Sequence, residues 1–292
     1  MSLNLSRREL IKATALAAAG AATFGISSRP ATAADSTTTQ PNPGRITQGV
    51  SMGPPSGMSF EQYLQECAKI GFKGVDLVGA DKFTVLKKYG MMATMIPSHS
   101  LPVGLSHKEN HDGCLAKIRA SIEVASAAGF PNVICFSGNR NGMADDEGAK
   151  NCVEALKKIA GFAEEKNVTL CMELLNSKVN HKDYMCDRTA WGVEVMKAVG
   201  SPRCKLLYDI YHMQVQEGDV IATIRQHIQY IGHFHTAGVP GRKDIDESQE
   251  LYYPAIMRAI ADTGYKGFVC HEFSPKGDKM KALVKAYNIC NV

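Results

Sequence analysis

Short runs of apolar and β-branched residues alternate with longer amphipathic patterns along most of this 292-residue chain. Each short run predicts a buried strand, and each amphipathic pattern predicts a helix. The predicted strands are residues 46–52, 74–78, 91–97, 132–137, 168–173, 204–209, 230–235 and 267–272. The predicted helices are residues 59–70, 82–89, 112–128, 145–166, 188–199, 219–227 and 250–263.

Eight strands with seven intervening helices repeat about every 32 residues, which is the arithmetic of a (β/α)₈ barrel. Five of the helical patterns end in a glycine turn shortly before the next strand. The alternative is a doubly wound open sheet, but the units are regular and the chain lacks a phosphate-binding glycine fingerprint. We therefore predict an α/β fold with a single TIM barrel over residues 45–292 and no second domain.

Four of the predicted strands end on a carboxylate or an imidazole, namely Glu173, Asp209, His235 and Glu272. Burying a charge is strongly unfavourable unless the charge is paired or binds a metal. One such residue would usually pair with a loop lysine, but four at equivalent positions predict one divalent metal site at the carboxyl ends of the barrel strands. Three carboxylates and one imidazole favour Mn²⁺ or Mg²⁺, with Co²⁺ as a further candidate.

Other polar residues follow the same strand ends, so they should face the same mouth of the barrel. We predict that they bind substrate: His99 after the third strand, Asn139 and Arg140 after the fourth, Asn176 after the fifth, His212 after the sixth and Arg242 after the seventh. The alternatives for His212 and Arg242 are a solvated loop histidine and a surface arginine. His233 lies one layer deeper than His235, which predicts a core histidine or a partner of a metal ligand.

The N-terminal stretch has the pattern of an export signal. Twin arginines at positions 7 and 8 precede an alanine-rich apolar run over 13–26, and the small residues at 31–33 offer a cleavage site. The alternative is a membrane-anchoring helix, which needs about 20 apolar residues. We predict a twin-arginine signal peptide over 1–34, a polar linker over 35–44, and an exported, periplasmic protein without membrane contact after the signal is removed.

Charge and cysteine content exclude some further classes. The formal net charge is only +4 and the basic residues are scattered, so we expect no nucleic-acid partner. The nine cysteines are spread singly, without a C-x-x-C pair, and several lie inside apolar runs. Such cysteines usually act as small buried hydrophobes, so we expect mostly free thiols and no structural zinc site.

At the site residues the chain resembles a known family. The segments ELLN (173–176), YDIYHMQ (208–214), HFHTAGVPGR (233–242) and GYKGFVCHEFSP (264–275), together with SGNRNG (137–142), resemble the hydroxypyruvate isomerase branch of the xylose-isomerase-like barrels. The resemblance implies that Glu173 and Glu272 bind the metal and also shuttle a proton. It further implies that Asp209 and His235 complete the metal site and that His212 and Arg242 hold the substrate.

The resemblance implies an isomerase that acts on a small sugar or hydroxy-keto acid through a metal-stabilised enediolate, with Glu173 and Glu272 as acid and base. Histidine at 235 is similar to the ketose 3-epimerases, whereas some hydroxypyruvate isomerases have glutamine there. The alternatives are therefore a ketose 3-epimerase, a metal-dependent sugar lyase, or a non-catalytic exported sugar-binding protein. A metal-dependent endonuclease shares the barrel, but it needs an Asp-x-His pair that GRKDIDESQE (241–250) lacks. The sequence leaves open whether chains associate as homo-oligomers.

Overall fold

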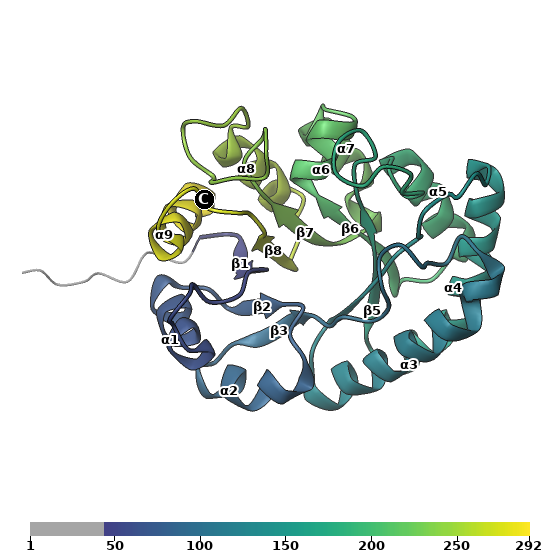
Figure 1. The fold of residues 1–292 in the computed structure, drawn as a ribbon, viewed down its shortest axis with the longest axis horizontal. Coiled ribbons are helices and arrows are strands. Elements are labelled where there is room, and N and C mark those ends of the chain that lie inside the picture. Colours follow the sequence, from purple (N-terminus) through teal and green to yellow (C-terminus); the bar gives the residue numbers. More distant parts are fainter. Residues whose placement is uncertain (1–43) are drawn as a thin grey trace, which may run out of the picture. The chain divides into compact units, whose positions relative to one another are not determined.

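The structure is a computed structural model that describes residues 44–292. Its eight strands are β1 (Thr47–Val50), β2 (Gly74–Asp76), β3 (Met92–Met95), β4 (Asn132–Cys135), β5 (Thr169–Leu174), β6 (Cys204–Asp209), β7 (Ile231–Thr236) and β8 (Phe268–His271). All pair in parallel, in the order β3-β2-β1-β8-β7-β6-β5-β4. A bridge between Ile96 and Val133 joins the two outer strands, so the sheet is a nearly closed barrel (Figure 1). The prediction of a single (β/α)₈ TIM barrel is confirmed.

The helices surround the barrel, as Figure 1 shows. They are α1 (Phe60–Ile70), α2 (Phe83–Lys88), α3 (His111–Ala128), α4 (Asp145–Glu165), α5 (Thr189–Val199), α6 (Ile210–Gln216), α7 (Val220–His227), α8 (Tyr253–Asp262) and α9 (Lys279–Cys290), with short 3₁₀ turns at Ala80–Lys82, Lys108–Asn110 and Ile228–Tyr230. Each predicted helix is present. The sequence analysis missed α6 and α9, and it began α8 too early. Residues 249–252 instead form a loop in which Gln249 bonds to the backbone of Leu251.

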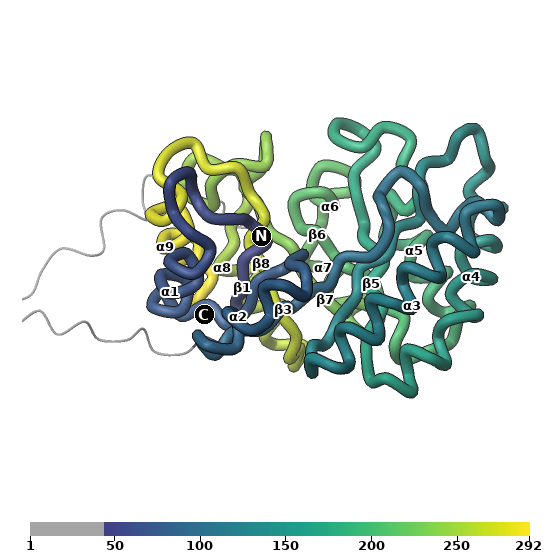
Figure 2. Tube along the Cα trace, turned by 60° about the horizontal axis from the view of Figure 1, so that its bottom comes forward, coloured from purple at the N-terminus to yellow at the C-terminus, as the bar shows by residue number. Residues whose placement is uncertain are grey.

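The first and last units of the barrel lie side by side (Figure 2). Strand β1 pairs with β8, and α9 packs beside α1. The ring of Phe72, just after α1, meets the ring of Tyr287 edge-on at 5.1 Å, and the Gly44 amide donates to Asn291 Oδ1. This pairing brings Glu272, directly after β8, to the same rim of the barrel as the loop after β1.

Two hydrophobic cores hold the barrel together. The larger core lies between the strands and the surrounding helices, while a smaller one inside the barrel consists of Met95, Ile134, Cys171 and Leu207. All nine cysteines are buried free thiols, as the sequence predicted. These four residues come from β3, β4, β5 and β6. Buried polar residues of β2, β5, β6 and β7 belong to the site described below.

The predicted signal peptide (1–34) and all of the predicted linker except Gly44 lie outside the described residues. They therefore stay predictions. Among residues 44–292, no helix combines the length and the hydrophobicity that a membrane span requires.

Candidate metal centre and active site

Four side chains from consecutive strands meet at the carboxyl end of the barrel. Glu173 comes from β5, Asp209 ends β6, His235 comes from β7 and Glu272 follows β8. Each offers one ligand atom, and these atoms all lie within 4.8 Å of one another. The register explains the convergence, since Asp209 is paired with His235 and inward-facing residues recur at every second position of a strand. The structure thus brings together the four residues predicted to bind the metal.

Close contacts between opposite charges connect this cluster. His235 Nδ1 lies 2.8 Å from Glu272 Oε2 and 3.4 Å from Glu173 Oε1. Arg242 Nη2 lies 2.6 Å from the same Glu272 oxygen and 3.4 Å from Asp209 Oδ2. Arg242, predicted to bind substrate, therefore lies at the edge of the cluster.

The pKa values of the acidic residues diverge. Burial raises the pKa of Glu173, although His235 opposes the shift. Burial also raises the pKa of Asp209; Arg242 opposes this, and the charge of Glu272 adds to it. Burial acts on Glu272 in the same direction, but His235 and Arg242 outweigh it and lower the pKa. Two carboxylates with oppositely shifted pKa values, facing one point, have the electrostatics of an acid/base pair.

This donor set fits a divalent cation. Three carboxylates repel one another in a buried site, and a cation would neutralise them. Oxygen and imidazole donors without thiolate are typical of ions such as Mn²⁺, Mg²⁺ and Co²⁺. The imidazole of His235 has its Nδ1 directed at two of the carboxylates. The residues present could hold one such ion.

Metal affinity is expected to rise with pH. Although burial opposes protonation of His235, the charge of Glu272 and hydrogen bonds to Asp76, Glu173 and Glu272 raise its pKa well above the ordinary value. At neutral pH the imidazole therefore carries a proton that an ion must displace. We expect the Mn²⁺ dissociation constant to fall by up to about tenfold per pH unit between about pH 6 and 8. Calorimetry in two buffers of different ionisation enthalpy measures the proton release, and a pH-independent affinity would contradict the assignment.

His212 faces the cluster from the first turn of α6. The Asp209 side chain caps this helix by accepting from the His212 backbone amide. Burial and the charge of Arg242 lower the pKa of the His212 ring to about 2, so the ring is neutral. The ring nitrogen Nδ1 accepts a hydrogen bond from the backbone amide of Asn176 at 3.2 Å. The hydrogen of the neutral ring is therefore on Nε2. Nε2 is buried, has no hydrogen-bond partner in the structure, and lies 3.7 Å from Asp209 Oδ2.

Asn176 is fully buried, and its side chain is occupied by its neighbours. The amide nitrogen lies 2.9 Å from Asn180 Oδ1 and 2.6 Å from His212 Nδ1, and the oxygen accepts from the Val179 and Asn180 amides. The structure therefore places Asn176 behind His212, where it orients the imidazole.

The remaining residues predicted to bind substrate contact the loops rather than the cluster. His99 Nδ1 lies 2.9 Å from Val103 O, and its Nε2 accepts from the Phe136 amide. Arg140 donates to the carboxylates of Asp145 and Asp187. It also donates to the backbone carbonyls of Tyr184 and Met185. The backbone carbonyl of Asn139 lies 3.0 Å from a ring nitrogen of His107. The side chains of His99 and Arg140 thus connect the loops after β3, β4 and β5.

The sequence analysis missed polar residues at the site. Asp76, the last residue of β2, is buried against His233 and His235. Burial by itself would raise the pKa of Asp76, but the two histidines outweigh it and lower the pKa. The signal was available, because a carboxylate interrupts the apolar strand GVDLV. His181, on the loop after β5, was missed as well. Its ring centroid lies 5.1 Å from that of His212.

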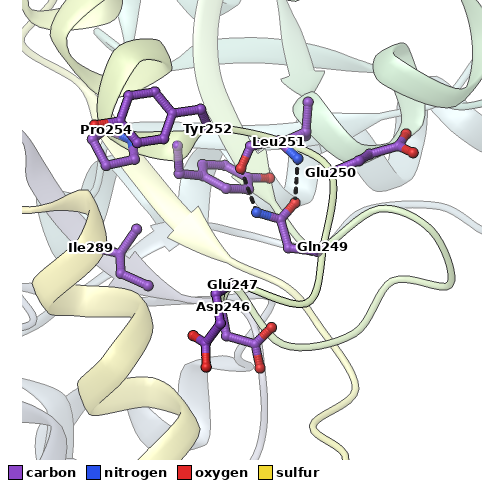
Figure 3. A pocket seen from close by; sticks show the side chains of 9 residues that line it. Asp246, Glu247, Gln249, Glu250, Leu251, Tyr252, Pro254 and Ile289 are labelled. Atoms are coloured by element: carbon purple, nitrogen blue, oxygen red, sulfur yellow. Dashed lines mark hydrogen bonds between the residues drawn. The ribbon is translucent and has the colours of Figure 1, made fainter.

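A small pocket opens above Glu272. It has a volume of about 240 Å³. Its lining residues are Ser51, Met52, Arg242, Glu272, Phe273 and Ser274. Figure 3 shows a separate pocket of about 380 Å³, formed by the loop before α8 and by Ile289 of α9. None of the four clustered ligands lines that second pocket, whereas Glu272 of the cluster lines the first one.

Fold and site together define a class of protein, a (β/α)₈ barrel with a buried carboxylate–imidazole cluster at the carboxyl ends of β5 to β8. Residues 64–288 match the xylose isomerase-like TIM barrel family. The chain belongs to this family.

The relatives of this chain include a protein named as an isomerase and one named as an epimerase. The hydroxypyruvate isomerase of Escherichia coli is 25% identical over 240 residues, which cover 75% of this chain and 91% of that protein. The D-psicose 3-epimerase of Ruminiclostridium cellulolyticum is 33% identical over 140 residues, 46% of this chain and 45% of that protein. A human relative is 29% identical over 171 residues, so the match spans 57% of this chain and about three fifths (62%) of that relative.

The fold also matches a solved structure. The crystal structure of an AP endonuclease, family 2, from Brucella melitensis superimposes with a TM-score of 0.71 at 21% identity, covering 82% of this chain and 96% of that chain. At this identity the likeness shows the fold alone.

Proposed function

We propose that this protein is a divalent-metal-dependent isomerase, similar to hydroxypyruvate isomerase, that acts on a small α-hydroxy carbonyl compound. The observation that carries the proposal is the convergence of Glu173 and Glu272 from β5 and β8 on one point, beside Asp209 and His235. Two carboxylates on either side of a metal site can move a proton between adjacent carbons of a substrate.

The residues of this chain have separate tasks in the proposed reaction. A bound divalent ion supplies a Lewis acid that stabilises negative charge developing on a substrate oxygen. The Nε2–H of His212 and the guanidinium of Arg242 donate to substrate oxygens and orient them. Glu173 and Glu272 are the two proton-transfer groups: one removes the proton from the carbon next to the carbonyl, and the other returns a proton to the neighbouring carbon. The unpartnered Nε2 of His212 supports this arrangement, because a buried donor without a partner is unfavourable until a ligand accepts from it.

A ketose 3-epimerase is the second candidate. In that reaction the proton returns to the opposite face of the same carbon, so the same two glutamates serve both outcomes. The observation that favours it is the histidine at 235, which resembles the ketose 3-epimerases, together with the 33% identity to the D-psicose enzyme.

The ion and the cellular setting belong to the same proposal. The donor set favours Mn²⁺ or Mg²⁺, with Co²⁺ as a third choice. The substrate is a small sugar or a hydroxy-keto acid, without nucleic acid as a partner. The twin arginines at positions 7 and 8 support export to the periplasm. Whether chains pair as homo-oligomers is decided by sedimentation of the mature chain.

Proton exchange in D₂O tests the function. The chain from Asp35 onward, loaded with Mn²⁺, is incubated with hydroxypyruvate and a panel of ketoses, and proton NMR follows deuterium uptake next to the carbonyl. We expect enzyme-dependent exchange that EDTA abolishes and added Mn²⁺ restores. Exchange only at C3 of a ketose would select the epimerase. Mn²⁺ without protein is the control, because free ions also promote enolisation. Absence of exchange in every compound, with the metal bound, would overturn the isomerase.

A further inference from the structure

Asp76 connects the far side of the barrel to the metal site. It ends β2, whereas the candidate ligands lie on or directly after β5 to β8. Its Oδ2 lies 2.8 Å from His233 Nε2 and 2.8 Å from His235 Nε2, and all three side chains are buried. One carboxylate oxygen therefore faces two ring nitrogens of β7, and one of these rings belongs to a candidate metal ligand.

This contact determines which nitrogen of His235 can bind a metal. A ring nitrogen whose lone pair faced a carboxylate oxygen would be repelled, so His235 Nε2 must carry a hydrogen that it donates to Asp76. The other nitrogen, Nδ1, lies 2.8 Å from Glu272 and 3.4 Å from Glu173. Without an ion the same repulsion places a hydrogen on Nδ1 as well. A bound ion displaces that hydrogen, and the Nε2–H tautomer then presents the Nδ1 lone pair to the metal site.

Asp76 is itself held in place. Its other oxygen accepts a hydrogen bond from the hydroxyl of Thr94 on β3. Gly74 makes room for this contact, because a Cβ atom at that position would lie 2.2 Å from Thr94 Cγ2. The carboxylate is thus fixed by one neighbouring strand and by two imidazoles, and it cannot turn away from His235 without losing these bonds.

A second metal ion between Asp76, His233 and His235 is the competing interpretation, because the three residues could also form a ligand group. The number of ions bound per chain distinguishes the two interpretations, because cis donors around an octahedral ion with bonds of about 2.0 Å also lie about 2.8 Å apart. Both contacts of Asp76 are 2.8 Å, which is an ordinary hydrogen-bond length.

We propose that Asp76 is a positioning residue that fixes the Nε2–H tautomer of His235 and so presents Nδ1 to the metal ion. The inference rests on the proposed function, because it needs the divalent ion to bind at Glu173, Asp209, His235 and Glu272. Hydrogen-bond partners of metal-ligating histidines typically change metal affinity about 10–100-fold when they are removed.

Asp76→Asn tests the inference, because the amide keeps the shape of the side chain but removes the negative charge that holds a hydrogen on Nε2 of both imidazoles. We expect the Mn²⁺ dissociation constant, measured by calorimetry on metal-stripped protein, to rise about 10–100-fold. In the Mg²⁺-loaded protein, ¹⁵N–¹H spectra of the imidazoles should show that His235 no longer holds the Nε2–H tautomer alone. Asp187→Asn is the matched control, since Asp187 is another buried aspartate, bonded to Arg140 and Ser177. Its Mn²⁺ affinity should equal that of the wild type.

Thr94→Val provides a second variant if Asp76→Asn does not fold. It keeps the carboxylate and removes only the hydroxyl that bonds to it, so a smaller loss of Mn²⁺ affinity is expected. Unchanged affinity in the variants, or an unchanged tautomer in Asp76→Asn, would overturn this inference alone. Two ions bound per wild-type chain would overturn it in favour of a second metal site. A wild-type chain that binds no divalent ion would overturn both this inference and the metal site of the proposed function.

Discussion

Glu173→Gln is expected to abolish turnover while the chain stays folded and still binds metal at high concentration. Glutamine keeps the size of the side chain and one oxygen that can face an ion, but it can neither accept a proton from carbon nor return one. General acid–base groups typically contribute about 10²–10⁴-fold to a rate, and the loss should be at the upper end because Glu173 also belongs to the metal cluster. The measurement is the rate of deuterium exchange from D₂O with Mn²⁺ saturating for the variant.

A control variant shows whether the loss of a carboxylate elsewhere in the chain also slows the exchange. Glu165→Gln removes a carboxylate at the end of α4 whose side chain is 68% exposed and pairs with Lys166 at 3.4 Å. Exchange in that variant should match the wild type. If Glu173→Gln retained a large fraction of the wild-type exchange rate with metal bound, Glu173 would not be one of the two proton-transfer groups. Glu272 would then be the first residue to test in its place.

The barrel could be predicted from the sequence because its signals are local and repeated. Each strand is a short apolar run, and most helices end at a glycine, so the eight units are visible without tertiary information. The two missed helices are not separated from their neighbours by these signals. Helix α6 starts directly at Asp209, with no loop between strand and helix, and α9 follows the last strand, where no further strand marks its end.

The site could be predicted where strand ends determine position. Glu173, Asp209, His235 and Glu272 converge because consecutive parallel strands bring their carboxyl ends to one rim. The loop residues could not be placed in this way. Arg140 follows β4 as expected, yet its guanidinium reaches the Asp187 carboxylate 47 positions further along the chain. Such a contact depends on how the loop after β5 folds back, and the periodicity of the strands carries no information about it.

Asp76 shows the opposite case, in which the local signal was present but its partner was distant. A carboxylate in a buried strand must find a partner, and here the partners lie 157 and 159 positions away. The four predicted ligands all come from strands that end on a carboxylate or an imidazole, and β2 was not among them. The rule that a buried charge needs a partner applies to every strand whose charged side chain points inward. Applied to all eight strands, it would have included Asp76 of β2.

Asp209→Asn is expected to change stability in opposite directions with and without metal. Asparagine is as good an N-cap as aspartate, so the hydrogen bond from the His212 amide to this side chain should persist. When folding raises the pKa of a carboxyl, the resulting stabilisation is fully present below the unfolded pKa and is lost as pH rises through the folded pKa. The ionised Asp209 therefore destabilises the metal-free chain at neutral pH, and Asp209→Asn should unfold at the same or higher denaturant concentration.

With metal the order should reverse. Removing a charged ligand should weaken Mn²⁺ binding about 100-fold or more, and a 100-fold rise in the dissociation constant lowers the stabilisation by excess ligand by about 2.7 kcal/mol. Urea unfolding at about pH 7.5, with EDTA and with excess Mn²⁺, measures both effects in each protein. Asp187→Asn is again the control for a buried aspartate outside the cluster, and it should keep the full Mn²⁺ stabilisation. Equal stabilisation of Asp209→Asn and wild type would remove Asp209 from the ligand set, because a ligand cannot lose its charge without a loss of binding energy.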